Sequence, residues 1–365
     1  MTRRKFINHM VRGMQSLVMM RLLAPLTSIG ASRDAAEIPA HYTPLSGRSL
    51  KELALKKLHH GNGRFLNPFG VPLKGRFWEL IRWKFSGNAF EKFIDEQPIQ
   101  PIDINWLPVI NHSGLSITFL KHAGLIIKDR EQTYYIDPVF DDIGFFLKDF
   151  TPRQFGLRQI PEANHILITH GHFDHLDTGS LRHFESGTHV ISPLGYDGVF
   201  RHLGMKNRSR LDWYETIESD KRRVTLLPSN HWTMRNPLEG PNRSLWGSFL
   251  LETQSGFTIY VSGDTAYFDG FEQIGDQFDI DLAIFNLGAY EPRWFMAQSH
   301  TNPMETVQAF TELKAKRLMI VHWGTFQLGD EPVHFPPRDI KMALQKEGLL
   351  DRLIDIKHGE TFFVD

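Results

Sequence analysis

Six consecutive residues, His170-Gly171-His172-Phe173-Asp174-His175, place three imidazoles and one carboxylate in a single short loop. Two histidines separated by one residue can point the same way from an extended turn, and the Asp-His pair then points toward a second position nearby. Imidazole and carboxylate groups suit zinc and related divalent ions. The loop holds more donors than one tetrahedral ion needs, so it predicts two metal ions side by side. The alternative is a polar turn whose histidines are incidental.

The sequence on both sides of this loop alternates between short apolar runs and turns. The apolar run at 165–169 predicts a strand whose C-terminal end leads directly into the loop. Further runs predict strands at 115–120, 125–128, 133–136, 189–192, 224–227, 247–252, 257–262, 282–285 and 318–321. Helical patterns lie at 177–184, 303–314 and 339–347, and Asn302-Pro303 is a typical helix start. Two successive halves of strands followed by helices predict an α/β fold, with two sheets packed face to face and helices outside.

Three further candidate ligands, each placed after a predicted strand, are His231, Asp264 and His322. Strand ends are rigid places from which side chains can be aimed into a shared cleft. A single histidine or aspartate in such a place is most often an ordinary polar turn residue. Their recurrence in order after the loop at 170–175 favours a common metal centre.

The composition excludes several classes of protein. The chain has 365 residues, of which 41% are hydrophobic, enough for one large domain with extensions or for two domains. Its 41 basic and 42 acidic side chains leave a net charge of −1, which disfavours a nucleic-acid partner and hence a metallonuclease. The sequence has no cysteine, so disulfides, thiolate metal ligands and cysteine nucleophiles are excluded.

The first 45 residues are predicted to be an export leader and linker. The stretch Thr2-Arg3-Arg4-Lys5-Phe6-Ile7 resembles the twin-arginine export motif of bacteria, and Ile29-Gly30-Ala31 would suit cleavage. The moderately apolar stretch between them, 14–31, is interrupted by charge and falls short of the ~18 apolar residues of a transmembrane helix. This predicts a place in the cell envelope, in the periplasm or at the outer membrane. The alternative is a basic tail on a cytoplasmic protein.

Residues 46–365 are predicted to form the main domain, in which 46–113 is an N-terminal extension with little strand pattern. Between 77 and 85, aromatic and apolar residues recur at helical spacing with basic residues beside them. Such a helix can bind a lipid interface, but packing against the main domain is the favoured interpretation. A membrane surface therefore stays a candidate partner, and the oligomeric state is not predicted.

The order of the metal motifs resembles the metallo-β-lactamase superfamily, whose fold is a four-layer αββα sandwich with two metal ions at one edge of its sheets. Over about 59–335 the chain more closely resembles the N-acyl-phosphatidylethanolamine-hydrolysing phospholipase D family and the related bacterial RomA-like outer-membrane proteins. The strings that carry this resemblance are Gly63-Arg64-Phe65-Leu66-Asn67-Pro68-Phe69, Leu245-Trp246-Gly247-Ser248, Gly263-Asp264-Thr265, Gly288-Ala289-Tyr290-Glu291-Pro292-Arg293-Trp294-Phe295-Met296 and His322-Trp323-Gly324-Thr325-Phe326. Phe173 stands where animal members have tyrosine, a change that removes a hydroxyl beside the metals.

The resemblance implies seven metal ligands, three for a first ion, three for a second and one that bridges both: His170, His172 and His231, then Asp174, His175 and His322, and finally Asp264. Zinc, with two ions per chain, is the default metal, and iron or manganese would suit the same side chains.

The resemblance also implies a reaction. A metal-bridging hydroxide would attack the phosphorus of N-acyl-phosphatidylethanolamine or a related membrane phosphodiester, as in a phospholipase D. Asp264 and Asp174 would orient the hydroxide and handle its proton, and His300 would donate to a phosphate oxygen or to the leaving group. A structural alternative for His300 is to cap the helix that begins near Asn302. The competing functions are a lactonase, thioesterase or other metal-dependent hydrolase on the same fold, and an envelope protein that affects outer-membrane composition.

Overall fold

The structure is a computed structural model of the chain, and it describes residues 42–70, 82–83, 88, 90–94, 98–144 and 147–364. The predicted export leader lies outside the described residues except for its last four positions, and so does most of the aromatic segment at 77–85. Trp83 of that segment is described. It donates from Nε1 to Asp330 Oδ2 (2.6 Å) and packs its ring against Trp294 and Phe295, as expected for a segment that packs on the main domain.

The first sheet carries the loop at 170–175. Over the described residues it has seven strands in the order β13-β1-β2-β3-β4-β5-β6. Their bounds are Leu115–Lys121 (β1), Gly124–Asp129 (β2), Gln132–Ile136 (β3), His165–Leu167 (β4), His189–Pro193 (β5), Arg208–Leu211 (β6) and Thr361–Val364 (β13). The strands from β13 to β3 pair antiparallel, whereas those from β3 to β6 run parallel. The loop leaves from the carboxyl end of β4, the end at which parallel strands usually present their sites.

The second sheet carries the other candidate ligands. In the described part of the chain it has six strands in the order β12-β11-β10-β9-β8-β7. Their bounds are Thr216–Ser219 (β7), Arg222–Leu227 (β8), Ser248–Glu252 (β9), Thr258–Val261 (β10), Leu282–Asn286 (β11) and Arg317–Val321 (β12). The loops after β8, β10 and β12 contain His231, Asp264 and His322 respectively.

The two sheets pack face to face, and both faces of the first sheet are buried. Successive side chains of a strand point to opposite faces. Accordingly Leu125, Ile127 and Ile136 join a core that also contains residues of the second sheet, whereas Ile126 and Tyr135 join a separate core beneath helices. Burial on both faces explains why these strands read as continuous apolar runs.

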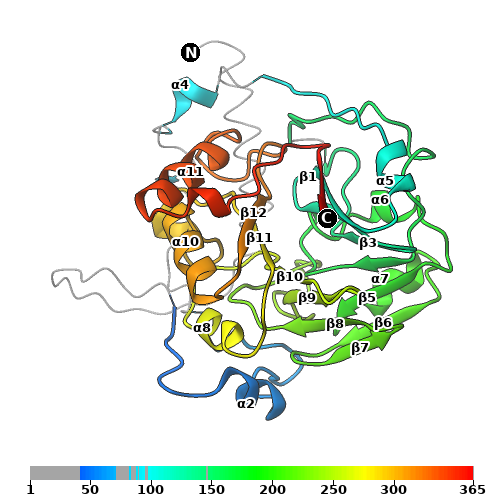
Figure 1. Cartoon of the computed structure of the whole chain (residues 1–365). Coiled ribbons are helices and arrows are strands. Elements are labelled where there is room, and N and C mark those ends of the chain that lie inside the picture. Colours follow the sequence, from blue (N-terminus) through cyan, green and yellow to red (C-terminus); the bar gives the residue numbers. More distant parts are fainter. Residues whose placement is uncertain are drawn as a thin grey trace.

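Helices cover the two outer faces, as Figure 1 shows. Those along the first sheet are α5 (Leu107–Asn111), α6 (Thr178–Leu181) and α7 (Asp197–His202), and those along the second are α8 (Gly270–Gly275), α10 (Pro303–Glu312) and α11 (Pro336–Lys346). The remaining helical segments are α2 (Leu50–Leu55), α4 (Glu91–Ile94), α9 (Arg293–Met296) and the 3-10 helix η1 (Leu350–Arg352). The predicted four-layer arrangement is confirmed. None of the helices in the described ranges is long and apolar enough to cross a bilayer.

The described part of the N-terminal extension shares the main core. Leu50, Leu53 and Phe69 are fully or almost fully buried in the cluster that lies between the sheets. The backbone N–H of Leu45 donates to Asp269 Oδ2 (2.9 Å), at the start of α8. Residues 42–70 are thus tied to the second sheet and its helices.

The sequence pattern missed some elements and overestimated one helix. The strands β6, β7 and β13 were not predicted; the first two lie at sheet edges and are rich in polar residues, so they lack a regular buried face. The helix predicted at 177–184 ends at Leu181, because His183 and Phe184 donate their N–H groups three residues back, to Ser180 and Leu181, in a tighter turn.

A pair of histidines joins neighbouring strands of the first sheet. His165 Nδ1 lies 3.2 Å from His189 Nδ1, and His165 Nε2 lies 3.0 Å from Gln132 Oε1. Burial, and then the neighbouring His189, lowers the pKa of His165 to about 4 from an ordinary value of 6.5. The imidazole is therefore neutral in the folded protein at pH 7, and protonation favours the unfolded chain. Its contribution to stability is complete above about pH 6.5 and is lost as the pH falls toward 4.

We expect the His165→Gln variant to lose less stability on acidification than the wild type. Between pH 7 and pH 5 the free energy of unfolding of the wild type should fall by on the order of 1 kcal/mol more than that of the variant. Urea denaturation of both proteins at both pH values measures this difference. Identical pH dependence in the two proteins would contradict the expectation.

Candidate metal centre

Backbone contacts hold the loop that follows β4. Gly171 N–H donates to Thr233 Oγ1 (2.9 Å), and a side chain at position 171 would meet Thr233 and the Tyr196 ring at 2.8 Å. Leu176 N–H donates to the C=O of His172 (2.9 Å) and closes the loop as a turn. Glycine therefore allows the loop to lie directly against the segment that follows β8 in the other sheet.

Three imidazoles converge at the first position. His172 Nδ1 lies 2.9 Å from His170 Nε2 and 3.3 Å from His231 Nε2. Asp264 Oδ2 lies 3.8 Å from Nε2 of both His170 and His231. Three ring nitrogens and a carboxylate oxygen that face one another at such distances form a ligand set for a cation.

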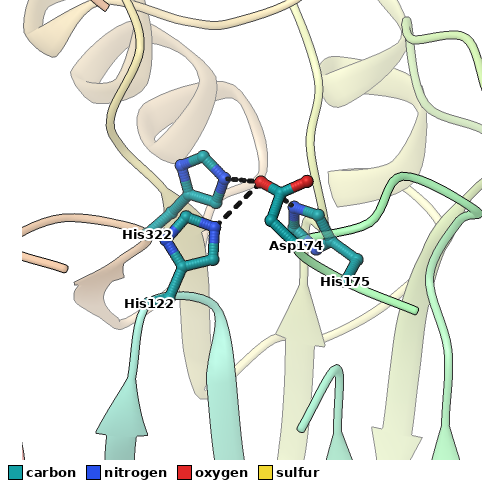
Figure 2. A group of neighbouring side chains, drawn as sticks. All are labelled: His122, Asp174, His175 and His322. Atoms are coloured by element: carbon teal, nitrogen blue, oxygen red, sulfur yellow. Dashed lines mark hydrogen bonds and ion pairs between the residues drawn. The ribbon is translucent and has the colours of Figure 1, made fainter. Parts of the chain in front are cut away.

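A second group lies beside the first. Figure 2 shows Asp174 surrounded by His122, His175 and His322. Oδ2 of this aspartate lies 2.9 Å from His122 Nε2, and 3.5 Å from Nε2 of both His175 and His322. The three imidazoles are buried, whereas 15% of the Asp174 side chain is exposed. The carboxylate is thus the member of this group that solvent or a substrate can reach.

Asp264 connects the two groups. Its Oδ2 lies 3.3 Å from His175 Nε2 and its Oδ1 lies 3.4 Å from His322 Nε2, while Oδ2 also faces the first group. Asn286 Nδ2 donates to Asp264 Oδ1 (2.8 Å) and fixes the orientation of the carboxylate. Asp264 therefore contacts ring nitrogens of both groups, as a bridging carboxylate would.

Hydrogen bonds on the far side of the rings orient the imidazoles. His175 Nδ1 donates to Asp137 Oδ2 (2.8 Å), and Asp137 in turn accepts from the backbone N–H of Thr169 (2.8 Å). His231 Nδ1 donates to the C=O of Ser299 (3.0 Å). In each case the bond engages Nδ1 and directs Nε2 at the cluster, the arrangement that metal-binding histidines usually have.

The imidazoles of the first group are neutral at pH 7. Burial, followed by the neighbouring His175, lowers the pKa of His170 well below its ordinary value. Burial also lowers the pKa of His231 well below its ordinary value and that of His172 to about 4. Neutral imidazole is the form that binds a cation, so these rings need to lose no proton first.

The carboxylates are ionised. Burial alone would raise the pKa of Asp174 and of Asp264, but the facing His175 and the other histidines outweigh burial, and both pKa values lie well below their usual range. Burial would in turn lower the pKa of His175, yet Asp264 and Asp174 raise it well above 6.5. Two buried negative charges therefore demand a positive partner, a role that a divalent cation fits better than a single proton.

Unpaired atoms at the site also fit a cation. Within the ranges that the structure describes, His175 Nε2 and His322 Nε2, which both face Asp264, are buried without a hydrogen-bond partner. A buried polar atom without a partner costs about 1–3 kcal/mol, so such atoms seldom gather without a ligand. The donor composition, histidine and aspartate alone, suits zinc and also iron or manganese.

Comparison with known proteins identifies the family. Residues 132–323, more than half of the chain, match the family model of the beta-lactamase superfamily domain. The chain belongs to the metallo-β-lactamase superfamily. It is a metal-dependent hydrolase of that fold, and the predicted superfamily is confirmed.

Relatives of this metallo-β-lactamase-fold chain include enzymes that act on lipids. The N-acyl-phosphatidylethanolamine-hydrolyzing phospholipase D 1 of Caenorhabditis elegans is 30% identical over 274 residues, which cover 70% of this chain and 75% of the relative. The outer membrane protein RomA of Klebsiella pneumoniae is 39% identical over 107 residues, which cover 29% of this chain and 77% of RomA. Igni18, a metallo hydrolase of the archaeon Ignicoccus hospitalis, shares the fold with a TM-score of 0.54 at 16% identity, covering 69% of this chain and 99% of Igni18.

His300 lies beside the two groups, with its ring near those of His231 and His322. Its side chain is 14% exposed, and its Nδ1 lies 3.9 Å from Asp264 Oδ2. It does not cap the following helix: Asn302 is the N-cap of α10, because its side chain accepts from Glu305 N–H (2.9 Å) while the Glu305 side chain accepts from Asn302 N–H (3.0 Å). The His300 imidazole is therefore not engaged in a helix cap.

Beside this centre lies a guanidinium group. Arg235 is placed over the ring of Phe173, 4.5 Å from its centroid, and Nη1 donates to the C=O of Leu176 (2.6 Å). Arg235 also lines a hollow of about 680 Å³ together with Tyr196 and Arg243. Among the described residues this half-buried guanidinium forms no ion pair with a carboxylate. Burial lowers the pKa of Arg235 while the Asp177 carboxylate raises it, so an anion bound here would further offset the cost of burying the guanidinium.

A third group of candidate ligands does not fit a cation. Nε2 of His59 and of His60 lie 2.6 Å and 2.7 Å from the Asp212 carboxylate. Lys57 Nζ lies 2.7 Å from the same carboxylate and already neutralises it. These contacts join the N-terminal extension to the turn after β6, and we interpret them as structural.

The sequence analysis missed two residues of the centre, His122 and Asp137. His122 directly follows β1 and Asp137 directly follows β3, both in the first sheet. The rule that identified the candidates of the second sheet, a polar residue where a strand ends, would also have indicated these two. Both residues precede the loop at 170–175 in the chain, whereas the other predicted ligands follow it in order.

Proposed function

We propose that this protein is a dinuclear-metal hydrolase that cleaves a phosphodiester of membrane lipid, with phospholipase D-type hydrolysis of N-acyl-phosphatidylethanolamine as the reaction. The observation that carries the proposal is the pair of His/Asp groups joined by Asp264. The Caenorhabditis elegans relative, which is named for this activity, supports the choice of substrate. A lipid substrate is also in keeping with the proposed export leader and envelope location.

The proposed ligands divide between the two positions, with zinc as the proposed metal and iron or manganese as alternatives: His170, His172 and His231 for the first, Asp174, His175 and His322 for the second, and Asp264 for both. Two divalent cations bound here would supply Lewis acidity for water and for the phosphoryl oxygens, a contribution of several kcal/mol.

Three side chains of the centre have separate proposed roles. Asp174 is partly exposed, so its carboxylate is placed to orient an attacking water and to share in handling its proton. Asp264 is buried and held by Asn286, which makes it the element that keeps the two positions at a fixed separation. Burial lowers the pKa of His300 to about 4, so this residue is neutral and would steady the leaving oxygen through an N–H group.

Arg235 supports an anionic substrate over a neutral one. A phosphodiester carries a negative charge at neutral pH, and a guanidinium binds phosphate oxygens with two parallel hydrogen bonds. The guanidinium lies over the ring of Phe173, a residue of the loop at 170–175. A lactone has no charge for it to neutralise, which is why we rank lactone hydrolysis second.

The proposal is tested by the turnover of N-acyl-phosphatidylethanolamine, a generic phosphodiester and a lactone by the zinc-loaded protein and by its Arg235→Gln variant. We expect turnover of the phospholipid, with phosphatidic acid as one product. In the variant, KM for the phospholipid should rise about 10–100-fold, the worth of one charged hydrogen bond of about 1.5–3 kcal/mol.

Arg243→Gln is the matched control, because Arg243 lines the same hollow but donates to the C=O of Gly63 and is exposed. This variant should keep the wild-type KM. Turnover of the lactone with none of the two phosphodiesters would contradict the proposed function and favour the second candidate.

A further inference from the structure

His122 lies in the turn between β1 and β2, far in sequence from the metal motifs. Its side chain is 1% exposed. Figure 2 shows it rising from the tip of this hairpin toward Asp174, beside His322. A buried histidine at the edge of a metal centre, outside the family's ligand motif, calls for a physical account.

Contacts from the segment that follows β12, in the other sheet, hold His122 in place. Its backbone C=O accepts from His322 N–H (2.6 Å), and its own N–H donates to Thr325 Oγ1 (2.9 Å). Its ring packs against those of His322 and Phe326, with centroids 4.1 Å and 5.1 Å away. These contacts fix the imidazole beside the ring of His322.

The direction of the hydrogen bond between His122 and Asp174 decides whether His122 can itself bind a metal ion. His122 Nε2 lies 2.9 Å from Asp174 Oδ2. An ionised carboxylate only accepts, so the imidazole donates and Nε2 carries the proton. A protonated ring nitrogen has no lone pair for a cation. The nitrogen of His122 that faces the centre can thus orient a ligand but not act as one.

Asp174 needs such a partner more than the other candidate ligands do. It is the most exposed member of its group, and it belongs to a loop, where a carboxylate has two rotatable bonds and several orientations. The same oxygen that His122 contacts faces His175 Nε2 and His322 Nε2. Holding that oxygen holds the carboxylate toward both of these rings.

We propose that His122 is a positioning residue that orients the Asp174 carboxylate toward the second metal position, so that this position binds its ion tightly. The inference rests on the two-metal centre proposed above and not on the choice of substrate. Removal of such hydrogen-bond partners of metal ligands typically weakens metal binding by about 10–100-fold.

The test uses three variants of the full chain. His122→Phe keeps a ring of similar size but removes the donor. His122→Gln places an amide N–H near the position of Nε2, whereas His122→Asn places it near Nδ1, away from Asp174. Zn²⁺ is titrated into each metal-free protein against a chromophoric chelator, and Co²⁺ spectra report the environment of the ion bound second.

We expect His122→Phe and His122→Asn to bind the second ion about 10–100-fold more weakly than the wild type, with the first ion unchanged. His122→Gln should recover most of the loss. Unchanged binding of the second ion in His122→Phe and His122→Asn would overturn the inference. It would also be overturned if His122→Gln were as deficient as the other two, which is the result for a residue that is itself a ligand.

A control variant and the behaviour of the wild type complete the test. His165→Phe replaces a histidine of the first sheet that is not part of the metal centre, and it should bind both ions like the wild type. Because binding of the first ion requires the fold, a misfolded variant is recognised by the loss of first-ion binding. If His122→Phe misfolds, the comparison rests on the Asn and Gln variants.

A wild type that binds a single ion would overturn the two-metal centre itself. A wild type that binds two ions but cleaves no phosphodiester would overturn the proposed substrate alone.

Discussion

Replacement of Asp264 by alanine is expected to weaken the binding of both metal ions and to lower kcat/KM for hydrolysis by at least about 10³-fold. The carboxylate lies within 3.8 Å of ring nitrogens in both groups, and it is buried. Its removal takes one donor from each position at once. Several kcal/mol of transition-state stabilisation depend on the ions, and each 1.36 kcal/mol corresponds to a factor of ten in rate.

The measurements are the metal content after dialysis and the rate with a phosphodiester. Asp269→Ala is a suitable control, since Asp269 lies five residues further along the same segment and accepts a hydrogen bond from Leu45 N–H. That variant should lose some stability while keeping both ions. An Asp264→Ala protein with two tightly bound ions and wild-type turnover would show that this carboxylate does not bridge.

Replacement of Asp174 or His175 by alanine is expected to remove one ion and to retain the other. Both residues belong to the second group, whereas the first group keeps His170, His172 and His231. Hydrolysis should fall by about 10³-fold or more, because a two-metal reaction loses one of its two charge-stabilising ions. Metal analysis should then give one ion per chain in each variant.

The two variants should differ in stability. His175 donates to the buried Asp137, so His175→Ala leaves this carboxylate without one of its partners, at a cost of about 1–3 kcal/mol. Asp174 is partly exposed, and its removal also relieves repulsion from Asp264, so Asp174→Ala should melt at a higher temperature than His175→Ala. Full activity in either variant would end the two-metal proposal.

Local sequence could predict the part of the site that lies in one segment or at strand ends. Residues 170–175 form a single turn, so their chemistry is visible without knowledge of the fold. His231, Asp264 and His322 were predicted because apolar runs precede them, and the structure brings all three to that turn. Their roles as ligands stay predictions until metal analysis is done.

The remainder depended on contacts that no local pattern encodes. His122 meets Asp174 across 52 positions of sequence, and Asp137 meets His175 across 38. Strand β13 pairs with β1, which lies about 240 positions earlier in the described chain. The sequence near residue 361 therefore holds no local pattern that predicts this pairing. Arg235 became a candidate for anion binding because it lies over Phe173 and forms no ion pair among the described residues. Both properties exist only in the folded protein.

The distribution of the proposed ligands over two sheets has a consequence for assembly. One sheet supplies the residues at 170–175, and the other supplies His231, Asp264 and His322. Neither sheet alone presents a complete set, so strong capture of ions must await the docking of one sheet upon the other. Ions bound after docking would hold the two sheets together. At a free-ion concentration 100 times the dissociation constant, each ion would add about 2.7 kcal/mol to the free energy of unfolding.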